Sequence, residues 1–268
     1  MKLLWLYRKE RERMKEETNK PEEILELAKR LREQDAIFVI ISKCTQMPYV
    51  ICDEDTFDDE ILIFEDVDDA RRVKERLEEK QEPVHIGKVD KPKQLLFYTT
   101  LYTMGVNAFI ANRGTQNEMR VQLQDFLPKP DSEKLPDGKV WIENPELHLT
   151  ALYFVQELRK TENPDITEEL KKLREEVLVD FQRGTYVIAM ADEKGLPMLK
   201  QKNGDVYQPV FTDIMEFNKF NVEKKFKPAM VEAEKISNIM APESKGVVVN
   251  PLGVNLPLQL QKKQQENK

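Results

Sequence analysis

The chain contains few of the side chains that most often carry out catalysis. It has two histidines, His85 and His148, among 268 residues. His85 falls in a predicted strand and His148 near the start of a predicted helix, and a lone histidine is more often structural than catalytic. A Ser/His/Asp or Cys/His arrangement remains geometrically open, but no nucleophile-elbow spacing supports it. We therefore assign no catalytic residue.

The sequence also lacks the loops that bind nucleotides. Phosphate-binding loops need clustered glycines, because backbone amides must come close to the ligand, and the chain has nine glycines in all. Neither the dinucleotide fingerprint nor the P-loop pattern occurs. These features argue against a Rossmann or P-loop enzyme, and we expect no cofactor.

One strongly acidic stretch could supply oxygen ligands to calcium or magnesium. It comprises Asp53-Glu54-Asp55 and Asp58-Asp59-Glu60, but it lacks the glycine and the spaced terminal glutamate of an EF-hand loop. The corresponding stretch of the second half, residues 200–205, is basic. This reversal argues against a duplicated metal site, so we expect a solvated acidic loop and no metal. It also suggests that the two halves, or two copies of the chain, attract one another.

The segment from Asn250 to Asn255 is the sharpest candidate for a functional surface. Gly253 permits a left-handed turn, and asparagine side chains can hydrogen-bond nearby backbone groups. One interpretation is a turn that ends the last strand; the other is a binding loop for a peptide or a small polar ligand. The candidate binding residues are Asn250, Pro251, Gly253 and Asn255.

Composition limits the compartment and the partners. The net charge is −7, which argues against a nucleic-acid partner. The first apolar run, residues 3–7, is too short for a secretory signal, and no stretch approaches the roughly 18 apolar residues of a membrane span. Cys44 and Cys52 flank a predicted turn without a nearby histidine, which is not a zinc spacing. We expect a cytoplasmic protein whose cysteines are thiols and whose partner is not a membrane.

A pattern of short apolar runs occurs twice along the chain, and both series end on asparagine, at Asn112 and Asn250. Such an internal repeat predicts two copies of one small module. The runs of the first copy are Phe38-Val39-Ile40-Ile41, Met47-Pro48-Tyr49-Val50-Ile51 and Ile61-Leu62-Ile63-Phe64. Those of the second copy are Tyr186-Val187-Ile188-Ala189-Met190, Leu196-Pro197-Met198-Leu199 and Tyr207-Gln208-Pro209-Val210-Phe211.

Each copy reads as an α/β (α+β) module with a mixed sheet flanked by helices. Asp66 is expected to cap a helix after the third strand, and Thr212 or Asp213 to do so in the second copy. In the first copy we predict strands at 36–42, 60–64, 84–89 and 106–111, and one further strand that begins at Pro48. Helices are predicted after Asp66 and at 93–104. The second predicts strands at 185–191, 196–200, 206–211, 226–231, 247–250 and 256–260, with helices after Asp213 and up to Met240.

A helix is expected to lead into each module. Pro21 suits a helix start, and Asn144-Pro145-Glu146 repeats the Lys20-Pro21-Glu22 pattern. The predicted organisation is an N-terminal charged helix (1–20), a first module (21–127), a linker (128–143), a second module (144–260) and a polar tail (261–268).

The chain resembles the SseB family, the enhanced serine sensitivity proteins. The resemblance rests on the Phe211-Thr212-Asp213 step into a helix and on the ending Val248-Val249-Asn250-Pro251-Leu252-Gly253-Val254-Asn255. Phe64-Glu65-Asp66 and Ala108-Phe109-Ile110-Ala111-Asn112 match the same places in the first module, which then departs with Arg113-Gly114. The resemblance implies a bacterial cytoplasmic α/β protein, covers roughly residues 20 to 260, and supplies no agreed catalytic residues.

We expect a non-catalytic binding or regulatory protein that recognises a protein partner or associates with itself. The duplication, the absent catalytic motifs and the resemblance support this hypothesis. One alternative is a small-ligand sensor, for an amino acid, which only the family name suggests. Another is an enzyme of unfamiliar type that uses Asp, Glu or Lys in a cleft between the modules.

Overall fold

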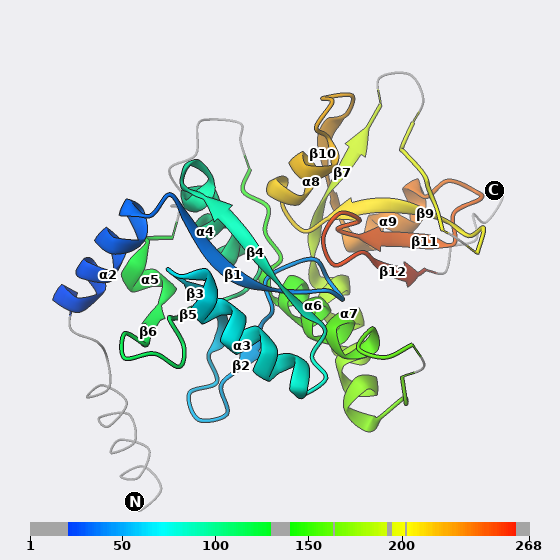
Figure 1. Cartoon of the computed structure of the whole chain (residues 1–268). Coiled ribbons are helices and arrows are strands. Elements are labelled where there is room, and N and C mark those ends of the chain that lie inside the picture. Colours follow the sequence, from blue (N-terminus) through cyan, green and yellow to red (C-terminus); the bar gives the residue numbers. More distant parts are fainter. Residues whose placement is uncertain (1–20, 130–139, 163, 192–194, 202, 261–268) are drawn as a thin grey trace, which may run out of the picture.

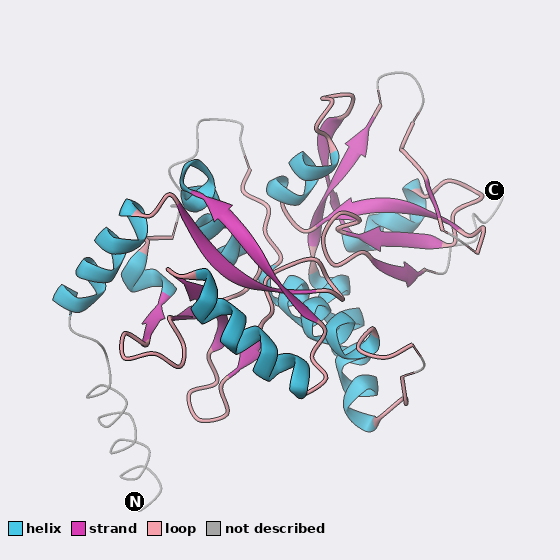
Figure 2. Cartoon of the chain, in the orientation of Figure 1, coloured by secondary structure: helices cyan, strands magenta, loops and turns pink. Residues whose placement is uncertain are grey.

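The computed structural model describes residues 21–129, 140–162, 164–191, 195–201 and 203–260. These residues form two mixed sheets of six strands each, with helices packed beside them. In Figure 1 the first sheet lies at the left, the second lies at the upper right, and helices α6 (Pro145–Leu158) and α7 (Glu168–Arg183) lie between and below them. Figure 2 shows that helices lie beside the strands in both halves. The predicted pair of mixed-sheet modules is confirmed.

The first sheet has the strand order β4-β1-β3-β5-β6, and β2 pairs with β3 beside this path. Its strands are β1 (Ala36–Ser42), β2 (Ile51–Cys52), β3 (Asp59–Phe64), β4 (Val84–Asp90), β5 (Ala108–Ala111) and β6 (Met119–Gln122). Its helices are α2 (Pro21–Glu33), α3 (Val67–Glu79), the short 3-10 helix η1 (Lys91–Lys93), α4 (Gln94–Thr103) and α5 (Leu123–Phe126).

The second sheet repeats this order as β10-β7-β9-β11-β12, with β8 on β9. Its strands are β7 (Thr185–Met190), β8 (Leu199–Lys200), β9 (Val206–Phe211), β10 (Lys227–Glu232), β11 (Gly246–Val249) and β12 (Leu256–Gln259). Besides α6 and α7, this half contains α8 (Ile214–Phe220) and α9 (Ala233–Ile239).

Strand register confirms that the two sheets correspond. β1 runs antiparallel to β3 with Phe38 opposite Phe64, and β7 runs antiparallel to β9 with Val187 opposite Phe211. β5 is parallel to β3 and β11 is parallel to β9. Each sheet is thus mixed in the same way, as a duplicated module requires.

The predicted aspartate caps start equivalent helices. The side chain of Asp66 accepts a hydrogen bond from the backbone N–H of Asp68 at the start of α3. The side chain of Asp213 accepts from Met215 and Glu216 at the start of α8. Both caps satisfy backbone donors that the first helical turn leaves unpaired.

A single hydrophobic core runs through both halves, and α6 lies within it. Leu147, Ala151, Leu152 and Val155 of α6 are at most 1% exposed. They belong to one cluster that also contains Ile61 of β3 and Val210 of β9. An apolar face on both sides of α6 explains this position, because a helix that is buried all round needs two neighbours. The opposite faces of the two sheets carry smaller separate clusters beneath α3 and α8.

The structure differs from the sequence prediction at several elements. The second strand of the first module is β2 alone, and Pro48 makes only an isolated bridge to Ile41. β6 and α5 were not predicted. α7, rather than the helix that starts at Pro145, directly precedes β7, as α2 precedes β1. The predicted N-terminal helix (1–20), residues 130–139 of the predicted linker and the predicted tail (261–268) lie outside the described residues.

Candidate functional site

Asn250 forms a buried clasp at the end of β11. Its backbone has φ 45° and its side chain is 0% exposed. The side-chain Oδ1 accepts a hydrogen bond from the backbone N–H of Thr212 at 2.9 Å, and Nδ2 donates to the Thr212 hydroxyl at 2.9 Å. Asn250 therefore ties the end of β11 to the connection between β9 and α8. It shapes the closing loop from inside rather than presenting its side chain to a partner.

Asn112 makes the equivalent clasp in the first module. Its backbone has φ 53°, its Oδ1 accepts from the N–H of Glu65 at 3.0 Å, and its Nδ2 donates to the Glu65 carboxylate at 2.7 Å. Short polar side chains tolerate left-handed backbone because they bond locally. The repeated asparagine that the sequence singled out is therefore a repeated structural device.

The other residues of the closing loop differ in accessibility. Gly253 is buried, but the left-handed backbone that the sequence suggested for it occurs at Asn250 and Asn255 instead. A Cβ atom at Gly253 would lie 2.8 Å from Oε2 of Glu216 on α8, so the Glu216 side chain would have to shift. Pro251 and Asn255 are partly exposed, and Leu252 is 59% exposed. The backbone N–H groups of Gly253 and Asn255 both donate to the Asn250 carbonyl, at 2.8 and 2.9 Å. A tightly bonded loop thus presents Leu252 to solvent.

Arg159 joins this loop to the first module. From the C-terminal end of α6 its guanidinium donates to the carbonyls of Cys44, at 3.1 Å, and Val254, at 3.1 Å. It also donates to the carbonyl of Asn255 at 2.6 Å. Cys44 belongs to the turn after β1, in which Gln46 is exposed. We call residues 43–47 together with residues 250–255 the composite surface, because Arg159 binds backbone of both segments.

A second polar cluster lies beneath the surface, where α6 meets both modules. His148 is 0% exposed, and its Nδ1 lies 3.2 Å from the carbonyl of Thr103, at the end of α4. A carbonyl only accepts, so Nδ1 carries the proton. The same nitrogen lies 3.4 Å from the Thr212 hydroxyl and 3.9 Å from Oδ2 of Asp213. Burial lowers the pKa of His148 and keeps the ring neutral.

This cluster has the residue types of an acid–base site but not the access. Asp213 is 1% exposed and Glu216 is 3% exposed, and Glu216 forms an ion pair with Lys219. Nε2 of His148 and Oε2 of Glu216 have no hydrogen-bond partner among the described residues. His85, on β4, is half-buried, and burial lowers its pKa as well. The described residues pack around His148 and leave it 0% exposed, and its contacts to Thr103 and Thr212 join the two modules.

Carboxylates of the acidic stretch already accept hydrogen bonds within the protein. Asp53 accepts from the backbone N–H groups of Asp55 and Thr56, and Asp58 accepts from Asn107 and Gln122. The hydroxyl of Tyr153, on α6, donates to Asp59 at 2.6 Å. Within the described part of the chain, no group of three or more His, Cys, Asp or Glu side chains is arranged to hold a metal ion.

Glu60 is the acid of this stretch with the most perturbed titration. Its side chain is 2% exposed, and burial raises its pKa to about 7. Nε of Arg120 lies 2.5 Å from Oε1 of Glu60, but the two groups are not aligned for a hydrogen bond. The positive charge of Arg120 lowers the pKa of Glu60 and so partly offsets the effect of burial. The nearby Asp53 and Asp58 raise the pKa further.

Both cysteines are free thiols. They do not pair across the predicted turn that they flank, because Cys44 lies in the turn after β1 whereas Cys52, on β2, pairs with Asp59 of β3. Burial raises the pKa of both thiols. A raised thiol pKa lowers the thiolate fraction near neutral pH and thus the reactivity.

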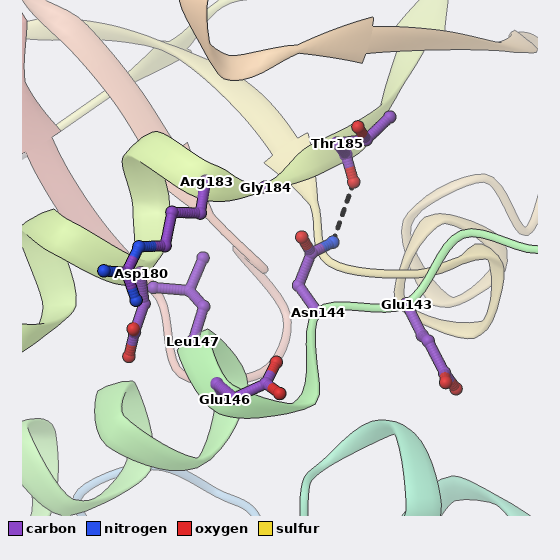
Figure 3. A pocket seen from close by; sticks show the side chains of 8 residues that line it. All are labelled: Glu143, Asn144, Glu146, Leu147, Asp180, Arg183, Gly184 and Thr185. Atoms are coloured by element: carbon purple, nitrogen blue, oxygen red, sulfur yellow. Dashed lines mark hydrogen bonds between the residues drawn. The ribbon is translucent and has the colours of Figure 1, made fainter.

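A polar pocket opens at the start of α6, beside the end of α7 (Figure 3). Its volume is about 420 Å³, and Glu143, Asn144, Glu146, Leu147, Asp180, Arg183, Gly184 and Thr185 line it. Asn144 is held in place, because its Nδ2 donates to the carbonyls of Thr185 and Thr212. Glu146 and Arg183 form no ion pair with a described residue. The pocket is therefore lined by a negative and a positive side chain that the described residues leave unpaired. None of its lining residues was a candidate from sequence.

Residues 156–262 match the family model described as the SseB protein N-terminal domain. No curated protein matches the chain. Among solved structures, Tic22 from Plasmodium falciparum is 12% identical, with a TM-score of 0.22 over 82% of this chain and 90% of that chain. Anabaena Tic22, described as a protein-transport structure, is 10% identical, with a TM-score of 0.20 over 82% and 85%. TM-scores this low do not establish a common fold.

Along the described residues, every helix is too short or too polar to cross a membrane. The stretch that matches the family model begins within α6 and contains β7 to β12, the whole second sheet. It also contains the Asn250 loop that carried the resemblance. The first module lies outside that stretch but has the same strand order. Residues 156–262, about two fifths of the chain, are therefore similar to the SseB protein N-terminal domain.

Proposed function

We propose that this protein is a non-catalytic binding protein that recognises a protein partner at the composite surface. The observation that carries the proposal is the set of three Arg159 contacts to Cys44, Val254 and Asn255. These contacts hold a loop of the second module and a turn of the first in one arrangement. A surface that is already ordered loses little conformational entropy when it binds.

The exposed side chains of this surface suit protein recognition. Leu252 is 59% exposed at the tip of the closing loop, with the partly exposed Pro251 beside it. Lys43 and Gln46 supply a polar rim from the neighbouring turn. An apolar centre with a polar rim is typical of protein interfaces. In this proposal Asn250 and Gly253 shape the surface, whereas Pro251, Leu252 and Asn255 contact the partner.

We expect Leu252→Asp to weaken partner binding at least tenfold, because a carboxylate would be buried in the interface without a counter-ion. The partner is first isolated by affinity chromatography from the source organism, and its dissociation constant is then measured by calorimetry. Leu95→Asp is the matched control, since Leu95 is an exposed leucine, at 66%, on α4. Equal affinities of the two variants for the partner would contradict the proposal.

The proposal places the protein in the bacterial cytoplasm. Two free cysteines, Cys44 and Cys52, are consistent with a reducing compartment. Cell fractionation of the source organism tests this placement. Self-association is the other form of partner recognition that the charge reversal suggested. However, hydrogen bonds already engage Asp53, Asp58 and Asp59 in the acidic loop.

A second candidate is a sensor of free amino acids, supported by the pocket of Figure 3. Arg183 can bind a carboxylate through its planar guanidinium, and Glu146 and Asp180 can bind an ammonium group. Asp180 accepts a hydrogen bond from Thr150 at 3.0 Å, which fixes its carboxylate. Thermal-shift measurements with free amino acids at millimolar concentration test this candidate, and an unchanged melting temperature across the series excludes it.

A further inference from the structure

The second module carries an open groove on its helical face. The groove lies between α7 and α9, which contact each other, and has a volume of about 550 Å³. Its apolar part is formed by Leu178 and Phe181 of α7, Ala233 of α9 and Leu260 after β12. The side chains of Leu178, Ala233 and Leu260 are only partly buried. The groove therefore has an apolar floor that the described residues do not cover.

The internal repeat identifies the equivalent place in the first module. Directly after β6, the backbone N–H of Leu123 donates to the carbonyl of Asn107 at 2.7 Å. Directly after β12, the backbone N–H of Leu260 donates in the same way to the carbonyl of Lys245 at 3.2 Å. Asn107 and Lys245 themselves donate to the first residues of β3 and β9, Asp59 and Val206. Leu260 is thus the counterpart of Leu123.

The first module fills this place with α5. α5 packs against α2, which precedes β1 as α7 precedes β7 (Figure 1). Its Phe126 ring lies 4.7 Å from the Tyr98 ring and 5.1 Å from the Phe109 ring. Leu123, the first residue of α5, is 1% exposed. One short helix with one aromatic side chain thus covers the apolar floor.

The sequence after Leu260 differs from the sequence after Leu123. The first module continues Leu123-Gln124-Asp125-Phe126-Leu127, whereas the second continues Leu260-Gln261-Lys262-Lys263-Gln264. Lys263 stands where the first module has Phe126, and residues 261–268 contain no apolar side chain. Among the described residues, the second module therefore has the floor of the site and no counterpart of α5 over it.

We propose that this groove binds a short helical segment of a partner protein, which presents one Phe or Leu side chain where Phe126 lies in the first module. This inference deepens the proposed function as a protein-binding protein, but it does not involve the closing loop. Arg183 and Glu234 both line the groove, so polar groups of either charge can flank that side chain. Helix-in-groove recognition uses the same contacts as the packing of α5.

The probe for this site is a labelled peptide with the sequence of residues 121–129, Val-Gln-Leu-Gln-Asp-Phe-Leu-Pro-Lys. It should bind the full chain saturably in fluorescence anisotropy, and replacing its Phe with Ala should weaken binding at least tenfold. Leu252→Asp should leave this binding unchanged, which separates the groove from the composite surface. No saturable binding, or equal binding of both peptides, overturns the proposal.

A second test changes the protein instead of the peptide. Lys263→Phe with Gln264→Leu gives the second module the residues of α5, so peptide binding should fall at least tenfold and the melting temperature should rise by roughly 2–4 °C. Gln261→Leu with Lys262→Phe adds the same side chains in the wrong positions and should do neither. Peptide binding that is unaltered by Lys263→Phe with Gln264→Leu overturns the proposal. The proposal is also overturned if the unaltered chain is a homodimer and only Lys263→Phe with Gln264→Leu makes it monomeric. A second copy of the chain would then be the occupant of the groove.

Discussion

Replacing Asn250 with alanine is expected to lower the free energy of unfolding by about 2–4 kcal/mol. The side chain is 0% exposed and makes both of its hydrogen bonds to Thr212. Alanine removes both bonds and leaves the Thr212 N–H without its acceptor inside the core. Alanine also tolerates the φ of 45° less well than asparagine does. Urea denaturation of the full chain measures the change.

Asn255 provides the control for backbone conformation. It has nearly the same φ, 47°, but its side chain forms no hydrogen bond with a described residue. Asn255→Ala should therefore cost less than about 1 kcal/mol. Asn112→Ala, the counterpart in the first module, should resemble Asn250→Ala because it also loses two side-chain bonds. If Asn255→Ala destabilised the chain as much as Asn250→Ala, the clasp would not be the cause.

Acidification below about pH 6.5 is expected to reduce stability through His148, by at most about 1.4 kcal/mol per pH unit. Burial lowers the pKa of this histidine in the folded chain, although the nearby Glu216 and Asp213 act in the opposite direction and Lys219 acts with burial. The unfolded chain takes up a proton below about pH 6.5, whereas the folded chain does not. The contribution is therefore complete above that pH and is lost as the pH falls toward the folded pKa.

His148→Asn isolates this effect, because an amide can still donate toward the Thr103 carbonyl but does not titrate. Denaturation curves between pH 5 and pH 7.5 should show a smaller pH dependence for the variant by about one proton. An identical slope in both proteins would show that His148 is not the responsible group. Since His148 contacts Thr103 of one module and Thr212 of the other, the same measurement reports on their contact.

The sequence predicted the elements that carry long apolar runs or clear caps. The run at residues 36–42 and the Asp66 cap both appear as expected, in β1 and at the start of α3. β6 was missed because Met119–Gln122 is four residues long and contains no continuous apolar run. Its strand character comes from pairing with β5, a contact that no local pattern encodes.

The candidate site was predicted only in outline. The repeated asparagines at 112 and 250 were visible in sequence, but their burial depends on the place of β5 and β11 inside each sheet. Arg159 was missed because one arginine on a helix gives no signal until α6 is placed between the modules. The apolar positions of α6 that face both halves were the only available sign of that placement.

Photo-crosslinking in the source organism tests the composite surface most directly. A photoreactive residue is placed at position 46 in one variant and at position 252 in another, and Leu95 on α4 provides the control position. Recognition at the composite surface predicts one and the same protein crosslinked from positions 46 and 252, and not from position 95. Different proteins at the two positions, or none at either, would contradict it.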